Sequence, residues 1–165
     1  MDHYATLARF NAWVNRRLYD AVAGLPAADY LADRGLFFGS VHRTLDHILV
    51  VDRLWSGRIA GRDRGIRALD QALHADLPSL SAARAAEDQA LVALVDSQAG
   101  DYARVVAYRP LGAPGEARMS VGQMLMALFN HQTHHRGQVT AALSQSGLSY
   151  PDLDVPYFIA EQGAR

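Results

Sequence analysis

The chain has 165 residues, of which 50% are hydrophobic and 20% are charged, a composition that suits a globular protein and excludes general disorder. Its 16 basic and 17 acidic residues leave a formal net charge of −1, which argues against a nucleic-acid partner because no excess of cations is available to neutralise phosphates. The sequence contains no cysteine, so disulfides and thiolate metal ligands are excluded. We see no signal peptide and no apolar run of about 18 residues. We therefore expect a cytoplasmic protein without a membrane partner, forming a single domain over residues 1–165.

The first predicted element is a helix over residues 2–23, where apolar side chains recur at three- and four-residue steps and so form one buried face. Gly24 and Pro26 end this helix. A connector follows, and we expect its aromatic residues Phe37 and Phe38 to pack on the helices.

The second and third helices are separated by a connector rich in arginine and glycine. Ser40 is a suitable N-cap for the second helix, whose apolar stripe continues beyond the middle of the element. Pro78 is expected to close the connector, so that the third helix begins at Ser79 or Ser81 and ends near Gln98.

A change of pattern at residues 102–119 predicts a small β-hairpin between the third and fourth helices, because larger side chains alternate there with smaller ones before a group of turn residues. Ser120 and Gln123 then form a capping box at the start of the last long helix, which Gly147 ends. A single helical turn is expected around residues 157–161. Four amphipathic helices predict an all-α fold, a four-helix bundle.

Two histidines, His131 and His135, lie in the middle of the buried stripe predicted for the last helix. A helix turns by about 100° per residue, so this i, i+4 spacing stacks the two rings, as in helices that give two ligands to one metal ion. Buried imidazoles that are both protonated would repel each other, whereas neutral imidazoles bound to a metal would not. The alternative is one hydrogen-bonded core histidine and one histidine at the edge, and the spacing alone leaves both open. His134 falls on the flank of the stripe and is a weaker candidate.

A third histidine, His47, also faces inward on the second helix, which favours a metal site made by three histidines. His42 faces away from it, and we expect a surface pair between His42 and Asp46. Asp52 has two interpretations: it could support a ligating imidazole, or it could be a surface group.

Three groups of residues carry a resemblance to a known family. They are Phe10, Asn11, Trp13, Asn15 and Leu18; Phe38, Ser40, Val41, Thr44, Leu45, His47, Ile48, Asp52 and Trp55; and Asn130, His131, His135, Arg136, Gly137 and Gln138. In these positions and spacings the chain resembles the DinB/YfiT superfamily of proposed metalloenzymes, and the similarity covers most of its length.

The resemblance implies a four-helix bundle with up-down-down-up topology and a three-histidine metal site. His47 would come from the second helix and His131 and His135 from the fourth. The divalent ion would be zinc or nickel, and the protein would be a homodimer. Some relatives use a low-molecular-weight thiol, such as bacillithiol or mycothiol, in transfer or isomerisation reactions.

Three histidine ligands leave a coordination position open for water or substrate, as in catalytic rather than structural zinc sites. We therefore expect a metal-dependent enzyme that acts on a small molecule, either a thiol-dependent S-transferase or isomerase or a hydrolase. The sequence identifies neither its catalytic residues nor any residue that binds a further cofactor. Hydrolysis would need a general base, and no glutamate adjoins the histidine pair in the H-E-x-x-H arrangement.

Other polar residues have open roles. Gln138, one turn after His135, could orient a ligand. Arg136 and the arginines of the second connector could receive an anionic substrate, or could be solvated charges at helix ends. The alternative to an enzyme is a non-catalytic metal-binding or stress-associated module.

Overall fold

The computed structural model describes residues 2–163, which are mostly helical with a small two-stranded antiparallel sheet. The long helices are α1 (His3–Val22), α3 (Val41–Ala60), α4 (Leu77–Ser97) and α5 (Val121–Gln145). The shorter elements are α2 (Ala27–Leu31), β1 (Val105–Tyr108), β2 (Ala117–Ser120) and α6 (Val155–Gly163). None of the helices in this part of the chain combines the length and the apolar character needed to cross a membrane.

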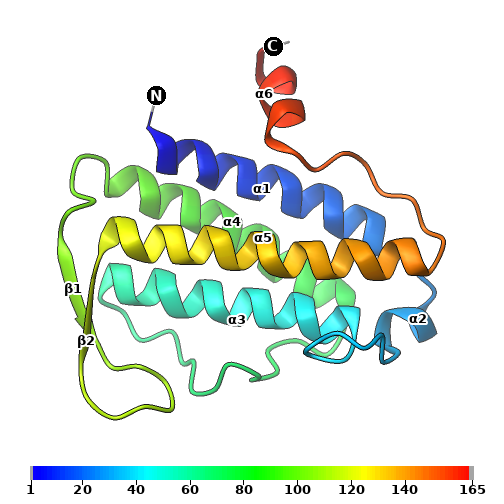
Figure 1. The fold of residues 1–165 in the computed structure, drawn as a ribbon, viewed down its shortest axis with the longest axis horizontal. Coiled ribbons are helices and arrows are strands. Elements are labelled where there is room, and N and C mark those ends of the chain that lie inside the picture. Colours follow the sequence, from blue (N-terminus) through cyan, green and yellow to red (C-terminus); the bar gives the residue numbers. More distant parts are fainter. Residues whose placement is uncertain (1, 164–165) are drawn as a thin grey trace.

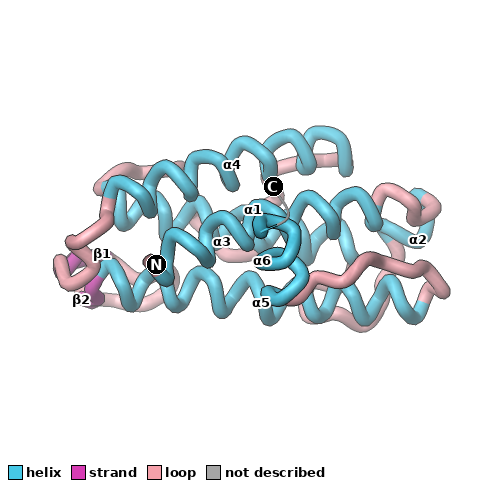
Figure 2. The backbone as a smooth tube through the Cα atoms, turned by 90° about the horizontal axis from the view of Figure 1, so that it is seen from above, coloured by secondary structure: helices cyan, strands magenta, loops and turns pink. Residues whose placement is uncertain are grey.

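The long helices lie side by side (Figure 1), with α1 against α4 and α5, and α3 against the same two helices. Helices α1 and α5 run in one direction, and α3 and α4 run in the opposite direction. The sheet lies at one end of the helices, and the connector over residues 61–76 passes along α3. Seen from above (Figure 2), α6 lies over α1, against which it packs.

Polar side chains determine where the long helices begin, because each satisfies backbone N–H groups that the first turn leaves free. Asp2, Ser40 and Asp76 accept such hydrogen bonds at the starts of α1, α3 and α4. Ser120 and Gln123 form the predicted capping box of α5, with both of its hydrogen bonds present. The predicted starts of α1, α3 and α5 are therefore confirmed.

The predictions were wrong at the start of α4, at α2 and at α6. Pro78 does not close the second connector but lies in the first turn of α4. N–H groups of the first turn have no acceptor within the helix, so proline, which has no N–H, costs no hydrogen bond there. Helix α4 consequently begins at Leu77 rather than at Ser79 or Ser81. Helix α2 was not predicted, and α6 is longer than the single turn expected around residues 157–161.

The core of residues 2–163 has two large apolar clusters, one toward each end of the long helices, and a small third cluster in which Trp13 and Val14 of α1 pack on Phe158 of α6. Between the two large clusters lies a set of buried polar side chains contributed by all four long helices. This buried polar layer comprises Asn11 and Asn15 of α1, Asp52 of α3, Arg84 and Asp88 of α4, and Gln132 and Arg136 of α5. The layer explains why helices with an apolar stripe still carry charged residues on their inner faces.

The predicted β-hairpin is confirmed, with Val105 opposite Ser120 and Tyr108 opposite Ala117. It packs on the end of α3, where the rings of Trp55 and Tyr108 meet edge to face at 5.6 Å. This packing supplies the support that a two-stranded hairpin needs in water.

The expectation for the aromatic pair of the first connector was only half right. The Phe37 side chain is 82% exposed, whereas Phe38 is half-buried and stacks on His47 with ring centroids 3.8 Å apart. Phe37 and Phe38 occupy the turn between the bridged residues Leu36 and Gly39, and their rings meet edge to face with centroids 4.9 Å apart.

Candidate metal centre

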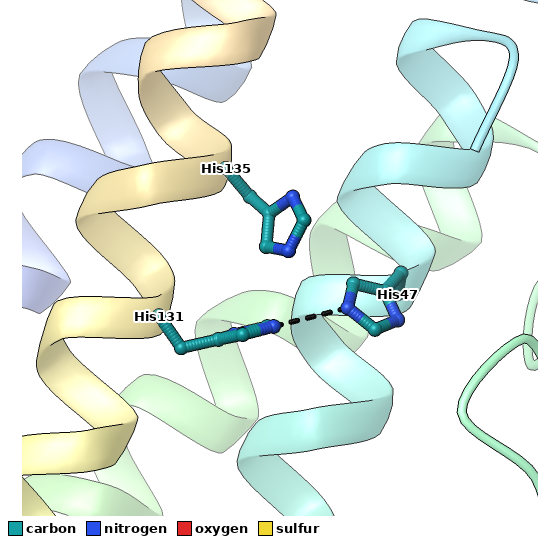
Figure 3. A group of neighbouring side chains, drawn as sticks. All are labelled: His47, His131 and His135. Atoms are coloured by element: carbon teal, nitrogen blue, oxygen red, sulfur yellow. Dashed lines mark hydrogen bonds between the residues drawn. The ribbon is translucent and has the colours of Figure 1, made fainter. Parts of the chain in front are cut away.

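The structure brings together the three histidines His47, His131 and His135. His47 projects from α3 toward the two histidines of α5, and all three rings enter the space between these helices (Figure 3). One ring nitrogen of each lies within 4.8 Å of the others, and the Nε2 atoms of His47 and His131 are 3.0 Å apart. Two nitrogens bound to a tetrahedral zinc ion lie about 3.3 Å apart, so modest ring rotations would fit the three donors around an ion.

Neighbouring groups orient two of the three rings. The Nδ1 atom of His47 lies 2.7 Å from the carbonyl oxygen of Leu69, and Nδ1 of His135 lies 2.8 Å from Oε1 of Gln138. A carbonyl oxygen only accepts hydrogen bonds, so each Nδ1 carries the proton and each Nε2 presents a lone pair. Both histidines are therefore held in the tautomer that binds a metal through Nε2.

The third ring, that of His131, is held differently. Its Nδ1 atom is buried and has no hydrogen-bond partner among residues 2–163, while its Nε2 atom faces Nε2 of His47. Since His47 presents a lone pair there, His131 donates a proton to it when no ion is bound. No described residue bonds to Nδ1 of His131 and so holds the proton on Nε2. The proton can therefore move to Nδ1, which frees Nε2 for a metal ion.

The site favours uncharged imidazoles. Burial lowers the pKa of His47, of His135 and, to about 3, of His131, and for His131 the neighbouring histidines lower it further. All three rings are therefore neutral at neutral pH, and neutral imidazole is the form that binds metal ions. The donor atoms, their tautomers and their charge all fit a divalent ion.

The three histidines line one part of a cleft of about 780 Å³, a size suited to a small molecule. We call it the histidine cleft. Its walls are mostly apolar and come from the first connector, α3, the second connector and the hairpin. They include Phe37, Phe38, Val51, Leu54, Trp55, Leu69, Tyr108, Pro110 and Leu111, and the further polar members are Arg58, Asp70 and His134.

The remaining candidates on α5 have distinct positions. His134 is exposed at the flank, as expected, with its ring 4.8 Å from that of His135, and it is not one of the three grouped histidines. Gln138 lies between the two: its Oε1 accepts from His135, and its Nε2 is 3.3 Å from His134. Gln138 thus orients His135.

The expected surface pair between His42 and Asp46 was wrong. Both side chains are buried, with exposed fractions of 7% and 2%. His42 contacts the Tyr30 hydroxyl at 2.7 Å and the His74 carbonyl at 3.1 Å, and Asp46 accepts a hydrogen bond from the Leu73 backbone at 2.8 Å. Helix α2 and the second connector cover this face of α3, and helical periodicity does not reveal such a covering.

Asp52 and Arg136 both belong to the buried polar layer. Asp52 therefore neither supports a ligating imidazole nor lies at the surface, and Arg136 cannot receive a substrate in the histidine cleft. Asp52 is fully buried and accepts hydrogen bonds from Arg84 and Gln132. Arg136 donates to Gln132 and to Asn11 on the far side of the helices.

The sequence analysis missed some groups that shape the site. The Leu69 carbonyl could not have been found, because every residue has one and only the fold decides its position. Tyr108 was also missed. Arg58 belongs to the arginine-rich segment over residues 57–67, whose arginines were considered for an anionic substrate, and it lies eleven positions after His47, three helical turns along the same face of α3. That periodicity could have placed Arg58 near the site, but not the Tyr108 ring that covers it.

Comparisons with known proteins agree with this fold. The DinB family model matches residues 1–164. Protein DinB of Bacillus subtilis (strain 168) is 25% identical over 170 residues, covering 96% of this chain and 94% of that protein. The uncharacterized protein YrdA of the same strain is 46% identical over 39 residues, which are 24% of this chain and 23% of YrdA. The crystal structure of a DinB-like protein from Bacillus cereus ATCC 10987 shares the fold, with a TM-score of 0.64 and 19% identity over 85% of this chain and 90% of that one. Because the family match spans nearly the whole sequence, this chain belongs to the DinB family.

Proposed function

We propose that this protein is a metal-dependent enzyme that acts on a small molecule, with His47, His131 and His135 as the ligands of a divalent ion, zinc or nickel. One observation carries the proposal: three neutral imidazoles converge at the wall of a cleft of about 780 Å³. Catalytic metal sites have this form, with three protein ligands and a position left for substrate.

A bound ion would supply Lewis acidity and would stabilise an anionic sulfur or oxygen atom at its open position. The residues of this chain would hold that chemistry in place. Leu69 and Gln138 keep His47 and His135 in their metal-binding tautomers, and Phe38 packs on the His47 ring. The apolar walls would exclude water from the reacting groups.

The proposed reaction class is thiol-dependent S-transfer or isomerisation, with a low-molecular-weight thiol as co-substrate, and hydrolysis comes second. Asp70 is the one carboxylate among the described residues that line the histidine cleft. A hydrolase needs a base that activates water, whereas a thiol bound to a metal ion loses its proton without one.

For architecture and assembly we propose a four-helix bundle with up-down-down-up topology that forms a homodimer in the cytoplasm, without nucleic-acid or membrane partners. The helix directions in Figure 1 support this topology, and the net charge of −1 supports the absence of nucleic acid. Light scattering of the purified protein tests the dimer, since a monomeric mass contradicts it.

Metal content by elemental mass spectrometry tests the site. The proteins are untagged wild type, His47→Ala and His131→Ala, with His3→Ala as a control that removes an exposed histidine elsewhere, and none passes over a nickel column. We expect about one ion per chain in wild type and in the control, and loss of the ion in both site variants while helical circular dichroism persists. Wild type that neither contains nor takes up zinc or nickel contradicts the proposal.

Turnover separates an enzyme from a non-catalytic metal-binding module. Transfer of a low-molecular-weight thiol to an electrophilic acceptor should proceed with metal-loaded wild type and stop in His131→Ala. A protein that binds its ion with full occupancy yet turns over none of a broad panel of thiols and acceptors supports the module instead.

A further inference from the structure

The histidine cleft has a second polar end, formed by Arg58. His47, Val51, Trp55 and Arg58 line the cleft from one face of α3. Eleven helical residues span about 16 Å, and a helical side chain leans toward the N-terminus of its helix. The Arg58 guanidinium therefore leans back along the cleft toward the histidines, at a distance that a small elongated molecule can bridge.

The Arg58 guanidinium is packed between two aromatic rings. Its central carbon lies 4.6 Å from the ring centroid of Trp55 and 4.2 Å from that of Tyr108. One amino group donates a hydrogen bond of 3.2 Å to the carbonyl of Arg109. These contacts hold the guanidinium by its faces and leave further N–H groups at its edge without a protein acceptor among residues 2–163.

Arg58 also lacks the acidic partner that Arg64 and Arg67 of the second connector have. Arg64 pairs with Glu87 at 2.8 Å and Arg67 pairs with Asp63 at 2.6 Å. In the described part of the chain no carboxylate lies within 4.0 Å of Arg58. Burial lowers the pKa of Arg58, because its cation has lost part of its hydration without gaining an anion.

We propose that the histidine cleft binds an elongated monocarboxylate, with its carboxylate on the free edge of Arg58, its apolar body along the cleft walls and its reacting group at the three histidines. This substrate class rests on the proposed function, which it makes more specific. A guanidinium edge matches the two oxygens of a carboxylate, and such pairs are among the strong hydrogen bonds of proteins.

The charges of the cleft favour a ligand with one negative group over a ligand with two. Arg58 is the one arginine or lysine among the described lining residues, whereas phosphate sites usually combine several donors or cations. The lining carboxylate, Asp70, follows Leu69, whose carbonyl is bonded to His47, and so lies at the histidine end. The apolar walls between the two ends suit an alkyl or aromatic body rather than a sugar.

Calorimetric titration with two probes of equal length tests this inference: ω-phenylhexanoate, which carries the carboxylate, and ω-phenylhexanol, which does not. The proteins are wild type, Arg58→Gln, Arg58→Lys and Arg62→Gln, each both chelator-treated and zinc-loaded. Arg62→Gln is the matched control, because it removes an exposed arginine just after α3 that does not line the histidine cleft.

We expect wild type and Arg62→Gln to bind the carboxylate about tenfold more tightly than the alcohol, with or without zinc. Arg58→Gln should lose this preference and keep its affinity for the alcohol, and Arg58→Lys should retain part of the preference.

The proposal is overturned if wild type shows no preference, if the preference persists in Arg58→Gln, or if Arg58→Gln loses alcohol binding equally, which would indicate damage to the hairpin wall. A preference that appears only with zinc places the carboxylate at the ion and also overturns it, while leaving the metal site intact. Conversely, a wild-type preference in a protein that binds no metal supports the Arg58 end and contradicts the proposed function.

Discussion

The Nε2 atoms of His47 and His131 face each other at 3.0 Å across the gap between α3 and α5. Because the Leu69 carbonyl fixes the proton of His47 on Nδ1, only His131 can supply the proton of this contact. The ion proposed for this site would replace the contact, since both nitrogens would become ligands.

That replacement predicts a change of tautomer at His131. Without metal its proton is on Nε2, and with zinc it should be on Nδ1, whereas His47 and His135 should keep their protons on Nδ1 throughout. Nitrogen–proton correlation spectra of the imidazoles, recorded before and after zinc addition, distinguish the two tautomers. A His131 ring that keeps its Nε2 proton in the zinc-loaded protein would exclude it as a ligand through that atom.

Gln138→Ala should weaken metal binding about 10- to 100-fold, because the acceptor that orients His135 is lost. Gln138→Glu keeps an acceptor for the same proton and should retain the affinity of wild type. Competition against a chromogenic chelator measures both. Equal affinities of Gln138→Ala and wild type would show that His135 is oriented by packing alone.

Asp52→Ala should lower the free energy of unfolding by about 3 kcal/mol, because it leaves Arg84 buried with one of its two carboxylate partners missing. Urea denaturation measures the loss, and Asp101→Ala, which breaks an exposed pair with Arg104, should cost less than about 0.5 kcal/mol. The folded fraction of Asp52→Ala should keep its metal ion. Loss of metal from a folded Asp52 variant would restore this residue as a partner of the site.

The N-cap of α1 predicts a pH dependence of stability. Hydrogen bonds from the Tyr102 hydroxyl and from the Ala5 and Tyr4 backbones lower the pKa of Asp2 below its unfolded value of 3.8. A carboxyl whose pKa is lowered by folding stabilises the folded state above the unfolded pKa, and this contribution is lost as the pH falls through the folded value. The stability difference between wild type and Asp2→Asn should therefore be constant from neutral pH to about pH 4 and then shrink in more acidic solution. Acid–urea titrations of both proteins measure it, and a difference independent of pH would be contrary evidence.

Two glycines should respond to alanine in opposite ways. A Cβ atom on Gly57 would lie 2.7 Å from the Arg62 carbonyl oxygen and from Cγ of Arg64, because the second connector folds back there. Gly57→Ala should therefore destabilise the protein by about 1–3 kcal/mol. Gly137 is in α5, and no atom lies within 4 Å of a Cβ atom built on it. Gly137→Ala should therefore raise the free energy of unfolding by about 0.5–1 kcal/mol. Thermal unfolding measures both, and a stable Gly57→Ala would show that the connector can move away.

Local features of the chain could be predicted because their causes are local. The caps at Asp2, Ser40 and Ser120 bond to backbone within three residues, so their positions in the sequence suffice to place the helix starts. The spacing of His131 and His135 likewise places both rings on one face of α5. Alternation and turn residues located the hairpin for the same reason.

The sequence by itself thus determined where the main helices and the hairpin lie and which histidines share a helix face. Tertiary structure alone decided what covers those faces. It buried His42 and Asp46 under α2 and the second connector, drew Asp52 and Arg136 into the buried polar layer, and put the Leu69 carbonyl on His47. These contacts join residues from separate elements, so their partners depend on how the helices pack and on the path of the connectors. A periodic pattern shows that a side chain faces inward, but the burial, the pKa and the chemistry of that side chain depend on the groups it meets there.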